Sequence, residues 1–395
     1  MRNQEHSGDN TEELMKDGII NVYKPAGMTS NDVIYKMRSI LGIRKLGHTG
    51  TLDPLATGIL PILINRGTRI TEYLDSDFKT YLATMILGIT TDTQDITGEI
   101  ISKSEKSKTD EIDFDDIKNA FSGFSGLIEQ IPPMYSAVRV DGRKLYDYVY
   151  SGEELPEDFR EKIKPRQVYI KELRIVNFTR GEENTAIRFG TYPRVTFEVI
   201  CSKGTYIRTI CQDAGDILGC GATLETLERT TSGAFTKENA FTLDEIREEA
   251  RKAGILDSDY HSVDKTFHDE IPEALLRFVV GLDFPMENFG EVRVSDEVAG
   301  KFIDGWHIRY GECKIIKNPE YEDIVDPKKL RTHLNDPGMN KGSNPGLKYH
   351  PEFKKTYKVY REDGLFLGIA VHSDKYHKLV ADKIFLRKEE LQRKE

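Results

Sequence analysis

Residues 47–58 read GHTGTLDPLATG and contain a single carboxylate, Asp53. Two turn-forming residues bound it, because Gly50 permits a positive φ and Pro54 disfavours the α region for the residue before it. The next residues, ILPILI at 59–64, are all apolar and predict a buried strand. A charged side chain on a stiff loop against a core strand is one way for a fold to present a reactive group, whereas an isolated Asp-Pro pair is more often a plain turn.

Three further blocks accompany this loop: GIINVYKPAGMTS at residues 18–30, QIPPMYSA at 130–137 and CSKGTYIRT at 201–209. Together the blocks resemble the motifs of the TruB family of tRNA pseudouridine-55 synthases, and they occur in the family's order. The resemblance covers residues 17–243. It implies the family's fold and reaction, with Asp53 as the catalytic carboxylate.

Length and composition are those of a globular protein. The chain has 395 residues, enough for two domains, with 38% hydrophobic and 31% charged residues. No apolar run reaches the roughly 18 residues of a membrane helix, and residues 1–10 lack the apolar segment of a signal peptide. The four cysteines form no CxxC pair, so we expect neither a disulfide scaffold nor a zinc site, and reduced thiols fit a cytoplasmic location.

The charge balance bears on RNA as a partner. A net charge of −10 argues mildly against a phosphate-rich ligand. The charge is uneven, however, because residues 16–75 carry eight basic and five acidic side chains. A local basic face on an acidic protein is sufficient for a compact RNA.

Apolar periodicity and capping signals predict a mixture of helices and strands. The expected elements are a strand at 18–23, a helix capped at 29–31 and ended by Gly42, a strand at 78–88, a helix at 114–127, strands at 167–178 and 194–201, a helix at 205–218 with Ile217 on its apolar face, and a helix opened by a capping box at 242–245. Because they follow no regular βαβ order, we expect an α+β fold with a mixed sheet rather than a doubly wound one.

The domain organisation follows from changes in composition. We expect a flexible tail at 1–16, a pseudouridine synthase domain at 17–255 and a small β-rich domain at 256–395, which the resemblance identifies as PUA-like. Asp363-Gly364 between apolar runs predicts a hairpin in that domain. Residues 317–350 are rich in Pro, Gly, Asn, Asp and Lys and are typical of a loop insertion or a disordered segment.

The implied reaction sets clear chemical requirements. Pseudouridine formation breaks the N1–C1′ bond of a uridine and joins C5 to C1′, with no redox change, so we expect no metal and no nucleotide cofactor. A carboxylate near the sugar can attack C1′ as a nucleophile or remove the C2′ proton as a base. The sequence leaves both roles of Asp53 open.

The resemblance also implies the groups closest to Asp53. Arg208, in the later motif, is the cation expected to keep the buried carboxylate ionised. Tyr81 matches the family tyrosine that stacks on the target base, since a flipped base recovers its lost stacking on an aromatic face. Without the motif context, Arg208 would be an exposed helix residue and Tyr81 a core aromatic.

Other matched positions have less distinctive residues. Tyr206 matches a second pocket tyrosine, and Leu227 matches a pocket wall. In the family, the residue matched by His48 enters the RNA and occupies the space left by the flipped nucleotide. Lys24 is expected to support the active-site loop or to contact a phosphate.

Two features concern RNA binding. Residues 132–137, followed by Arg139, Arg143 and Lys144, resemble the family's mobile RNA-gripping segment, which positions the RNA backbone. After Leu227 the chain has Glu228-Arg229 where family members often carry two basic residues, and we expect this departure to remove one phosphate contact.

The resemblance therefore implies a cytoplasmic enzyme that converts uridine 55 in the T loop of tRNA to pseudouridine. The T arm of tRNA is its expected partner, with no membrane, no obligate protein partner and a monomeric state. One alternative is an RNA-guided archaeal or eukaryotic relative, but the partner surfaces are not evident. Another is a non-catalytic tRNA-binding or folding factor, against which the joint presence of Asp53, Tyr81 and Arg208 argues.

Overall fold

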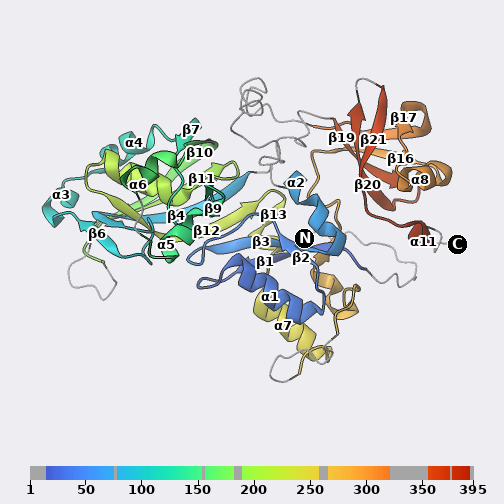
Figure 1. The fold of residues 1–395 in the computed structure, drawn as a ribbon, viewed down its shortest axis with the longest axis horizontal. Helices are drawn as coiled ribbons and strands as arrows, with labels where there is room; N and C mark the ends of the chain where they lie inside the picture. The colour runs from blue at the N-terminus through green and yellow to red at the C-terminus, as the bar shows by residue number, and fades with distance from the viewer. Residues whose placement is uncertain are drawn as a thin grey trace.

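The chain folds into a large mixed sheet flanked by helices and a smaller β-rich domain at its C-terminal end (Figure 1). The structure is a computed structural model that describes residues 15–74, 78–153, 156–181, 189–257, 266–320, 355–373 and 376–391. Within these ranges, no helix is long and apolar enough to span a membrane.

The large sheet has eleven strands, and eight of them form its main path. Their order is β14 (Phe241–Thr242), β1 (Gly18–Lys24), β3 (Thr57–Ile64), β12 (Ala222–Ser232), β4 (Lys79–Leu87), β11 (Arg194–Cys201), β10 (Arg166–Thr179) and β7 (Gly126–Gln130). The short strands β2 (Leu46–His48), β13 (Phe235–Thr236) and β15 (Val279–Val280) pair with β3, β12 and β1. Parallel pairs β1–β14 and β3–β12 lie among antiparallel ones, which confirms the predicted mixed sheet.

The apolar run at 59–64 forms β3, as predicted, and is buried on both faces. Alternate residues of a strand point to opposite faces. Leu60 and Ile62 belong to the main core, whereas Ile59 and Leu63 belong to a second core shared with the C-terminal domain. The continuous apolar pattern therefore reflects cover on both sides of β3.

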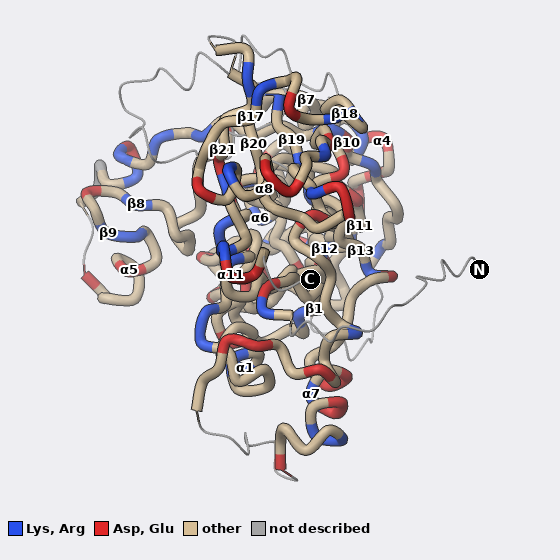
Figure 2. The backbone as a smooth tube through the Cα atoms, turned by 90° about the vertical axis from the view of Figure 1, so that its right-hand side faces the viewer, with Lys and Arg blue, Asp and Glu red and all other residues tan. Residues whose placement is uncertain are grey.

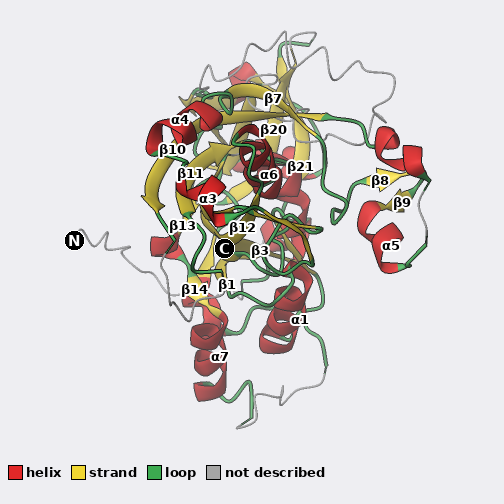
Figure 3. Cartoon of the chain, turned by 90° about the vertical axis from the view of Figure 1, so that its left-hand side faces the viewer, coloured by secondary structure: helices red, strands yellow, loops and turns green. Residues whose placement is uncertain are grey.

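The helices confirm most of the capping predictions. Helix α1 (Ser30–Leu41) begins at the capping box of Thr29 and ends at Gly42, whose φ is 66°. Helix α7 (Leu243–Lys252) begins at the predicted box of Thr242, and α1 and α7 lie side by side on one side of the sheet (Figure 3). Helix α6 (Ile207–Ile217) packs against β12.

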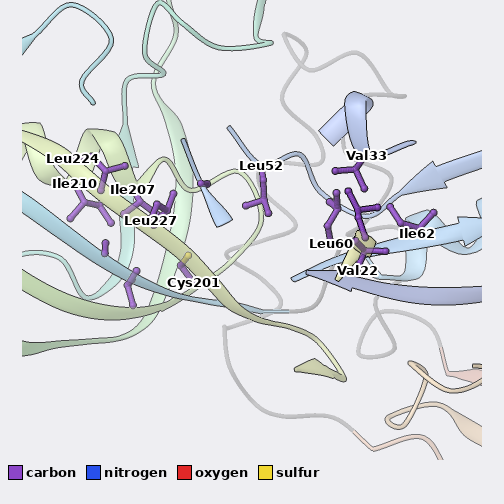
Figure 4. Packing of buried hydrophobic residues seen from close by; sticks show 14 of the residues in the cluster. Val22, Val33, Leu52, Leu60, Ile62, Cys201, Ile207, Ile210, Leu224 and Leu227 are labelled. Carbon is purple, nitrogen blue, oxygen red and sulfur yellow. The ribbon is translucent and has the colours of Figure 1, made fainter. Parts of the chain in front are cut away.

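The main core has two neighbouring groups of side chains (Figure 4). The group near α1 includes Val22, Val33, Leu60 and Ile62, and the group near α6 includes Cys201, Ile207, Ile210, Leu224 and Leu227. Leu52, which is 3% exposed, lies between the two groups. The residue before Asp53 is thus anchored between the two groups of the main core.

Two sequence predictions need correction. The helix expected at 114–127 is α4 (Phe114–Phe121) only, because the chain turns through Gly126, whose φ is 73°, and continues as strand β7. Ile217, predicted on the apolar face of α6, is 62% exposed. Ile217 is the last residue of α6, and the neighbouring Leu218 packs against the main core in its place.

A small module projects from the large sheet (Figure 3). It contains the hairpin β8 (Arg139–Val140) and β9 (Arg143–Lys144), followed by α5 (Leu145–Tyr150). It has its own apolar cluster, made of Val140, Leu145, Phe159 and Ile163. Lys and Arg lie along β8 and β9, while Asp and Glu gather on α7 (Figure 2).

The remaining α-helices and strands that precede the C-terminal domain are short. They are α2 (Thr71–Leu74), the hairpin β5 (Ile89–Thr91) and β6 (Ile100–Lys103), and α3 (Lys106–Asp110).

The C-terminal domain is a six-stranded sheet with order β17-β21-β20-β19-β16-β18. Its elements are β16 (Gly290–Val294), α8 (Asp296–Ile303), β17 (Ile308–Arg309), β18 (Cys313–Lys317), β19 (Thr356–Arg361), β20 (Phe366–Ser373), β21 (Lys378–Ile384) and α11 (Lys388–Leu391). The predicted hairpin joins β19 to β20, with Gly364 at φ 93°. This β-rich domain fits the PUA-like prediction.

Two predicted segments lie largely outside the described residues. Of the tail at 1–16, residues 1–14 are not described. Of the segment at 317–350, Lys317 is the last residue of β18, and residues 321–350 are not described.

Candidate active site

The loop that carries Asp53 is fixed to the N-terminal motif by backbone groups on both sides of the carboxylate. The hydroxyl of Ser30 accepts from the Leu52 amide at 2.8 Å and donates to the Leu52 carbonyl at 3.2 Å. The Gly27 amide donates to the Pro54 carbonyl at 2.8 Å. The residues before and after Asp53 are therefore held, which preorganises the carboxylate.

Lys24 lies beneath the same loop and has no exposed surface. Its Nζ donates to the carbonyls of Met28 at 2.6 Å, Pro25 at 2.9 Å and Pro54 at 3.4 Å. Desolvation lowers the pKa of Lys24 to about 8, although the negative charge of Asp53 opposes the shift. Of its two predicted roles, this burial supports holding the loop and not a phosphate contact.

Arg208 joins the Asp53 loop to two other parts of the chain. It is the second residue of α6, is 5% exposed, and places Nη2 at 2.9 Å from Oδ2 of Asp53. Its Nη1 donates to the Thr93 carbonyl and its Nη2 to the Tyr135 carbonyl, both at 3.0 Å. These contacts fix the plane of the guanidinium against the carboxylate.

Burial and a neighbouring cation shift the pKa of the Asp53 carboxylate in opposite directions. Its side chain is 39% exposed, which leaves it open to a ligand. Desolvation raises the pKa of Asp53, Arg208 lowers it, and the nearby Asp95 raises it; the net shift is upward. Arg208 thus opposes the protonation that burial favours.

Sequence reasoning missed Asp95, a buried carboxylate that also lies beside Arg208. Asp95 is 6% exposed, and its Oδ2 lies 3.9 Å from Nη1 of Arg208. Its Oδ1 accepts from the Thr97 amide at 2.9 Å and the Thr93 hydroxyl at 3.0 Å in the turn between β5 and β6. The TDTQDITG string at 91–98 is the sequence signal that predicts such a turn.

The three residues predicted to surround the target base come from different parts of the chain. Tyr81 lies on β4, and burial raises the pKa of its phenol. Leu227 lies opposite Ala83 in the adjacent pair of strands and is 8% exposed. Tyr206 is the residue before α6, and its amide donates to Oε1 of Gln130 at 2.9 Å.

Gln130 is another residue whose role sequence reasoning missed, although it lies in a quoted motif. It is 2% exposed, and its Nε2 also donates to the Tyr206 carbonyl at 3.1 Å. Both polar groups of one side chain therefore bind the backbone of one pocket residue. Burial raises the pKa of the Tyr206 phenol, and Ser136 opposes this shift.

The other predicted residues lie around this centre. His48 is the last residue of β2, opposite Ile62, where the chain enters the Asp53 loop. Glu228 accepts from the Tyr23 hydroxyl at 2.8 Å and from Lys237 Nζ at 2.9 Å, and hydrogen bonding from Lys237 and Tyr23 keeps the pKa of Glu228 low against desolvation. Arg229 is 1% exposed. Its side chain faces the protein interior and not a phosphate.

Comparison with known proteins gives a consistent result. Residues 38–207 match the model of the TruB family pseudouridylate synthase (N terminal domain), and residues 208–280 match that of the tRNA pseudouridylate synthase B C-terminal domain. The chain is 34% identical over 359 residues to tRNA pseudouridine synthase B of Clostridium novyi (strain NT), covering 91% of this chain and 96% of that protein.

Two further similarities agree. The chain is 38% identical over 290 residues to tRNA pseudouridine synthase B of Syntrophus aciditrophicus (strain SB), covering 73% of this chain and 80% of that protein. Among solved structures, a chain of a Cbf5-Nop10-Gar1 complex aligns with a TM-score of 0.60 at 20% identity, covering 96% of this chain and 88% of that chain. The last similarity is one of fold.

Proposed function

Because the chain belongs to the TruB family of pseudouridylate synthases, we propose that it converts uridine 55 in the T loop of tRNA to pseudouridine, with Asp53 as the catalytic carboxylate. The chain is a tRNA pseudouridine synthase, an isomerase. The observation that carries the assignment of Asp53 is its contact with Arg208 at 2.9 Å on a loop fixed at both sides.

The geometry gives different roles to the two carboxylate oxygens of Asp53. Arg208 binds Oδ2, so we assign the contact with the substrate to Oδ1. In the isomerisation this oxygen either attacks C1′ as the N1–C1′ bond breaks, or removes the proton from C2′ as a base. Both steps need the ionised carboxylate, which the adjacent guanidinium stabilises.

The target base is held by the residues around this carboxylate. Tyr81 supplies an aromatic face for the flipped base, while Leu227 and Tyr206 form the pocket walls. Burial raises the pKa of Tyr81, so its phenol stays neutral at physiological pH. His48, at the entry to the loop, occupies the position in the RNA that the flipped nucleotide leaves.

The tRNA is bound by a wider surface. The module of β8, β9 and α5 presents Arg139, Arg143 and Lys144, which position the RNA backbone. The enzyme acts as a monomer in the cytoplasm without an obligate protein partner.

We also propose a boundary between the two domains. The composition change suggested a division after residue 255. We prefer a division after Val280, because β15 pairs with β1 and Leu275 and Phe278 pack in the main core.

A tritium-release assay tests the function. Purified protein is mixed with unmodified tRNA transcript carrying [5-³H]uridine, and the product is mapped to its position. We expect release from position 55 and none from a matched transcript with cytidine there. Tight binding of tRNA without release would instead support a non-catalytic binding factor.

A further inference from the structure

Arg229 is the largest fully buried side chain among the described residues. It is 1% exposed, and no ion pair within 4 Å is found for it in the described part of the chain. Burying a charged group without a counter-ion is costly, so the contacts that compensate it are informative.

The guanidinium of Arg229 binds both ends of the Asp53 loop. Its Nη2 donates to the carbonyl of Gly50, three residues before Asp53, at 3.1 Å. Its Nε donates to the carbonyl of Ile59, six residues after Asp53, at 2.7 Å. One planar group therefore spans the loop from inside the protein.

Two glycines make room for this arrangement. A Cβ on Gly58 would lie 2.2 Å from the carbonyl oxygen of Arg229, so β3 and β12 approach closely only with glycine there. Gly50 has a φ of 76°, and a Cβ on it would lie 3.2 Å from Nη1 of Arg229. Gly58 therefore lets the backbones of β3 and β12 meet, and Gly50 leaves room for the Arg229 guanidinium.

Arg229 also faces the base-stacking tyrosine. Arg229 lies directly opposite Tyr81 in the antiparallel pair β12–β4, and residues in that relation share one face of a sheet. Its positive charge and hydrogen bond oppose the rise in the pKa of the Tyr81 phenol that burial causes. The Arg229 guanidinium therefore acts on the Tyr81 phenol and is hydrogen-bonded to the Asp53 loop.

We propose that Arg229 is a positioning residue for the isomerisation, which fixes the Asp53 loop relative to Tyr81. This inference rests on the proposed function of Asp53 and Tyr81. Arginine suits the task because its rigid fork donates in several directions in one plane, whereas a lysine ammonium is a single point of attachment. Arg229 contacts neither substrate nor solvent, so it acts through the loop and the ring.

The test compares R229Q and R229K with R194Q. Arg194 is a matched control, because it lies in the same sheet and binds Glu225 through two contacts, at 2.7 and 2.8 Å, away from Asp53. Three quantities are measured: the single-turnover rate of tritium release with enzyme in saturating excess, the Kd for tRNA, and the Tm. A variant that only folds less well lowers the amplitude of release, not its rate.

We expect R229Q to lose about 10²-fold in single-turnover rate, the loss typical of a catalytic group displaced by about 1 Å, with R229K in between. The Kd for tRNA should change by less than about twofold, since buried cations do not contact phosphates. R194Q should keep the wild-type rate even if its Tm falls. In a Y81F background, R229K should lose less than it does alone, because the two residues act as a unit.

If R229Q and R194Q both release tritium at the wild-type rate, the role of Arg229 is overturned and the proposed function is left intact. Loss of tRNA affinity at an unchanged rate would overturn it as well, since Arg229 would then shape the RNA surface. If R229Q does not fold, R229K decides by the same criteria. Absence of turnover by the wild-type protein would instead reject the proposed function itself.

Discussion

At the scale of single residues, the site is a carboxylate kept partly exposed beside a buried guanidinium. Burial raises the pKa of Asp53 and Arg208 lowers it, with the net shift upward. Because a carboxyl group loses its charge as the pH falls through its pKa, activity should decline on the acidic side at a pH set by this balance.

Replacing Arg208 with glutamine should move that acidic limb to higher pH. The substitution removes the cation that favours the charged form, and such a neighbour commonly lowers a carboxyl pKa by about 1–3 units. We expect the pH profile of kcat/KM for tritium release to shift upward by a similar amount. R174Q, which alters an arginine 58% exposed, is the control and should keep the wild-type profile; an unshifted limb in R208Q would separate Asp53 from Arg208.

Replacing Lys24 with methionine should destabilise the protein. It removes a hydrogen-bond donor from three carbonyl groups, of which only that of Pro54 keeps the Gly27 amide described above, for a loss of about 1–3 kcal/mol in the free energy of unfolding. The pKa of Lys24 is about 8 in the folded protein against 10.5 ordinarily, so between these pH values the unfolded chain binds more protons. The stabilisation from Lys24 therefore rises with pH across this window.

Urea unfolding from pH 7 to pH 10 measures both effects. We expect the free energy of unfolding of the wild-type protein to rise relative to that of K24M as the pH increases. A constant difference across the window would show that Lys24 is not held in a low-dielectric site.

At the scale of elements, the loop is positioned by the start of α1. Ser30 is the first residue of that helix, and its hydroxyl binds both backbone polar groups of Leu52. S30A should therefore loosen the loop and lower kcat, by up to about 10²-fold, with little change in KM. S122A removes an exposed serine contact at the end of α4 and is the control; equal kcat in the two variants would contradict this role of α1.

Local signals account for the elements that the sequence predicted well. Caps, an apolar period and turn glycines are short-range features, so α1, β3, β11 and the hairpin after β19 could be predicted. The predicted helix at 114–127 is longer than α4, because the pairing of β7 with β10 is a long-range contact that local patterns do not contain. In the site, the motif resemblance identifies Asp53 and Arg208 as functional residues. The contacts of Asp95, Gln130 and Arg229 join residues far apart in the sequence, and no local pattern predicts them.

At the scale of the whole molecule, the C-terminal domain is docked against the catalytic unit. Phe289, Ile369 and Phe385 of that domain share a core with Ile59 and Leu63 of β3. The opposite face of β3 packs in the core that surrounds the Asp53 loop. One strand therefore contacts both the C-terminal domain and the core beneath the Asp53 loop.

Replacing Arg66 with alanine tests this docking. Arg66 binds Glu390 of α11 through two contacts, at 2.8 and 3.0 Å, and Asp17 at 2.6 Å. Because the pairs are partly buried, we expect tRNA binding to weaken by about 1 kcal/mol. This change raises the KM for tRNA about fivefold and leaves kcat unchanged. K388A removes an ion pair within the C-terminal domain and should leave KM unaltered; the same KM in both variants would show that Arg66 does not fix the domain.

The role of Asp53 is tested most directly by single-turnover tritium release from position 55 with the D53N protein, alongside its Kd for the same tRNA. Asparagine keeps the shape of the side chain but can neither attack C1′ nor accept the C2′ proton as a carboxylate does. We predict no detectable release by D53N with tRNA affinity largely retained. Release at the wild-type rate would show that another group performs the reaction.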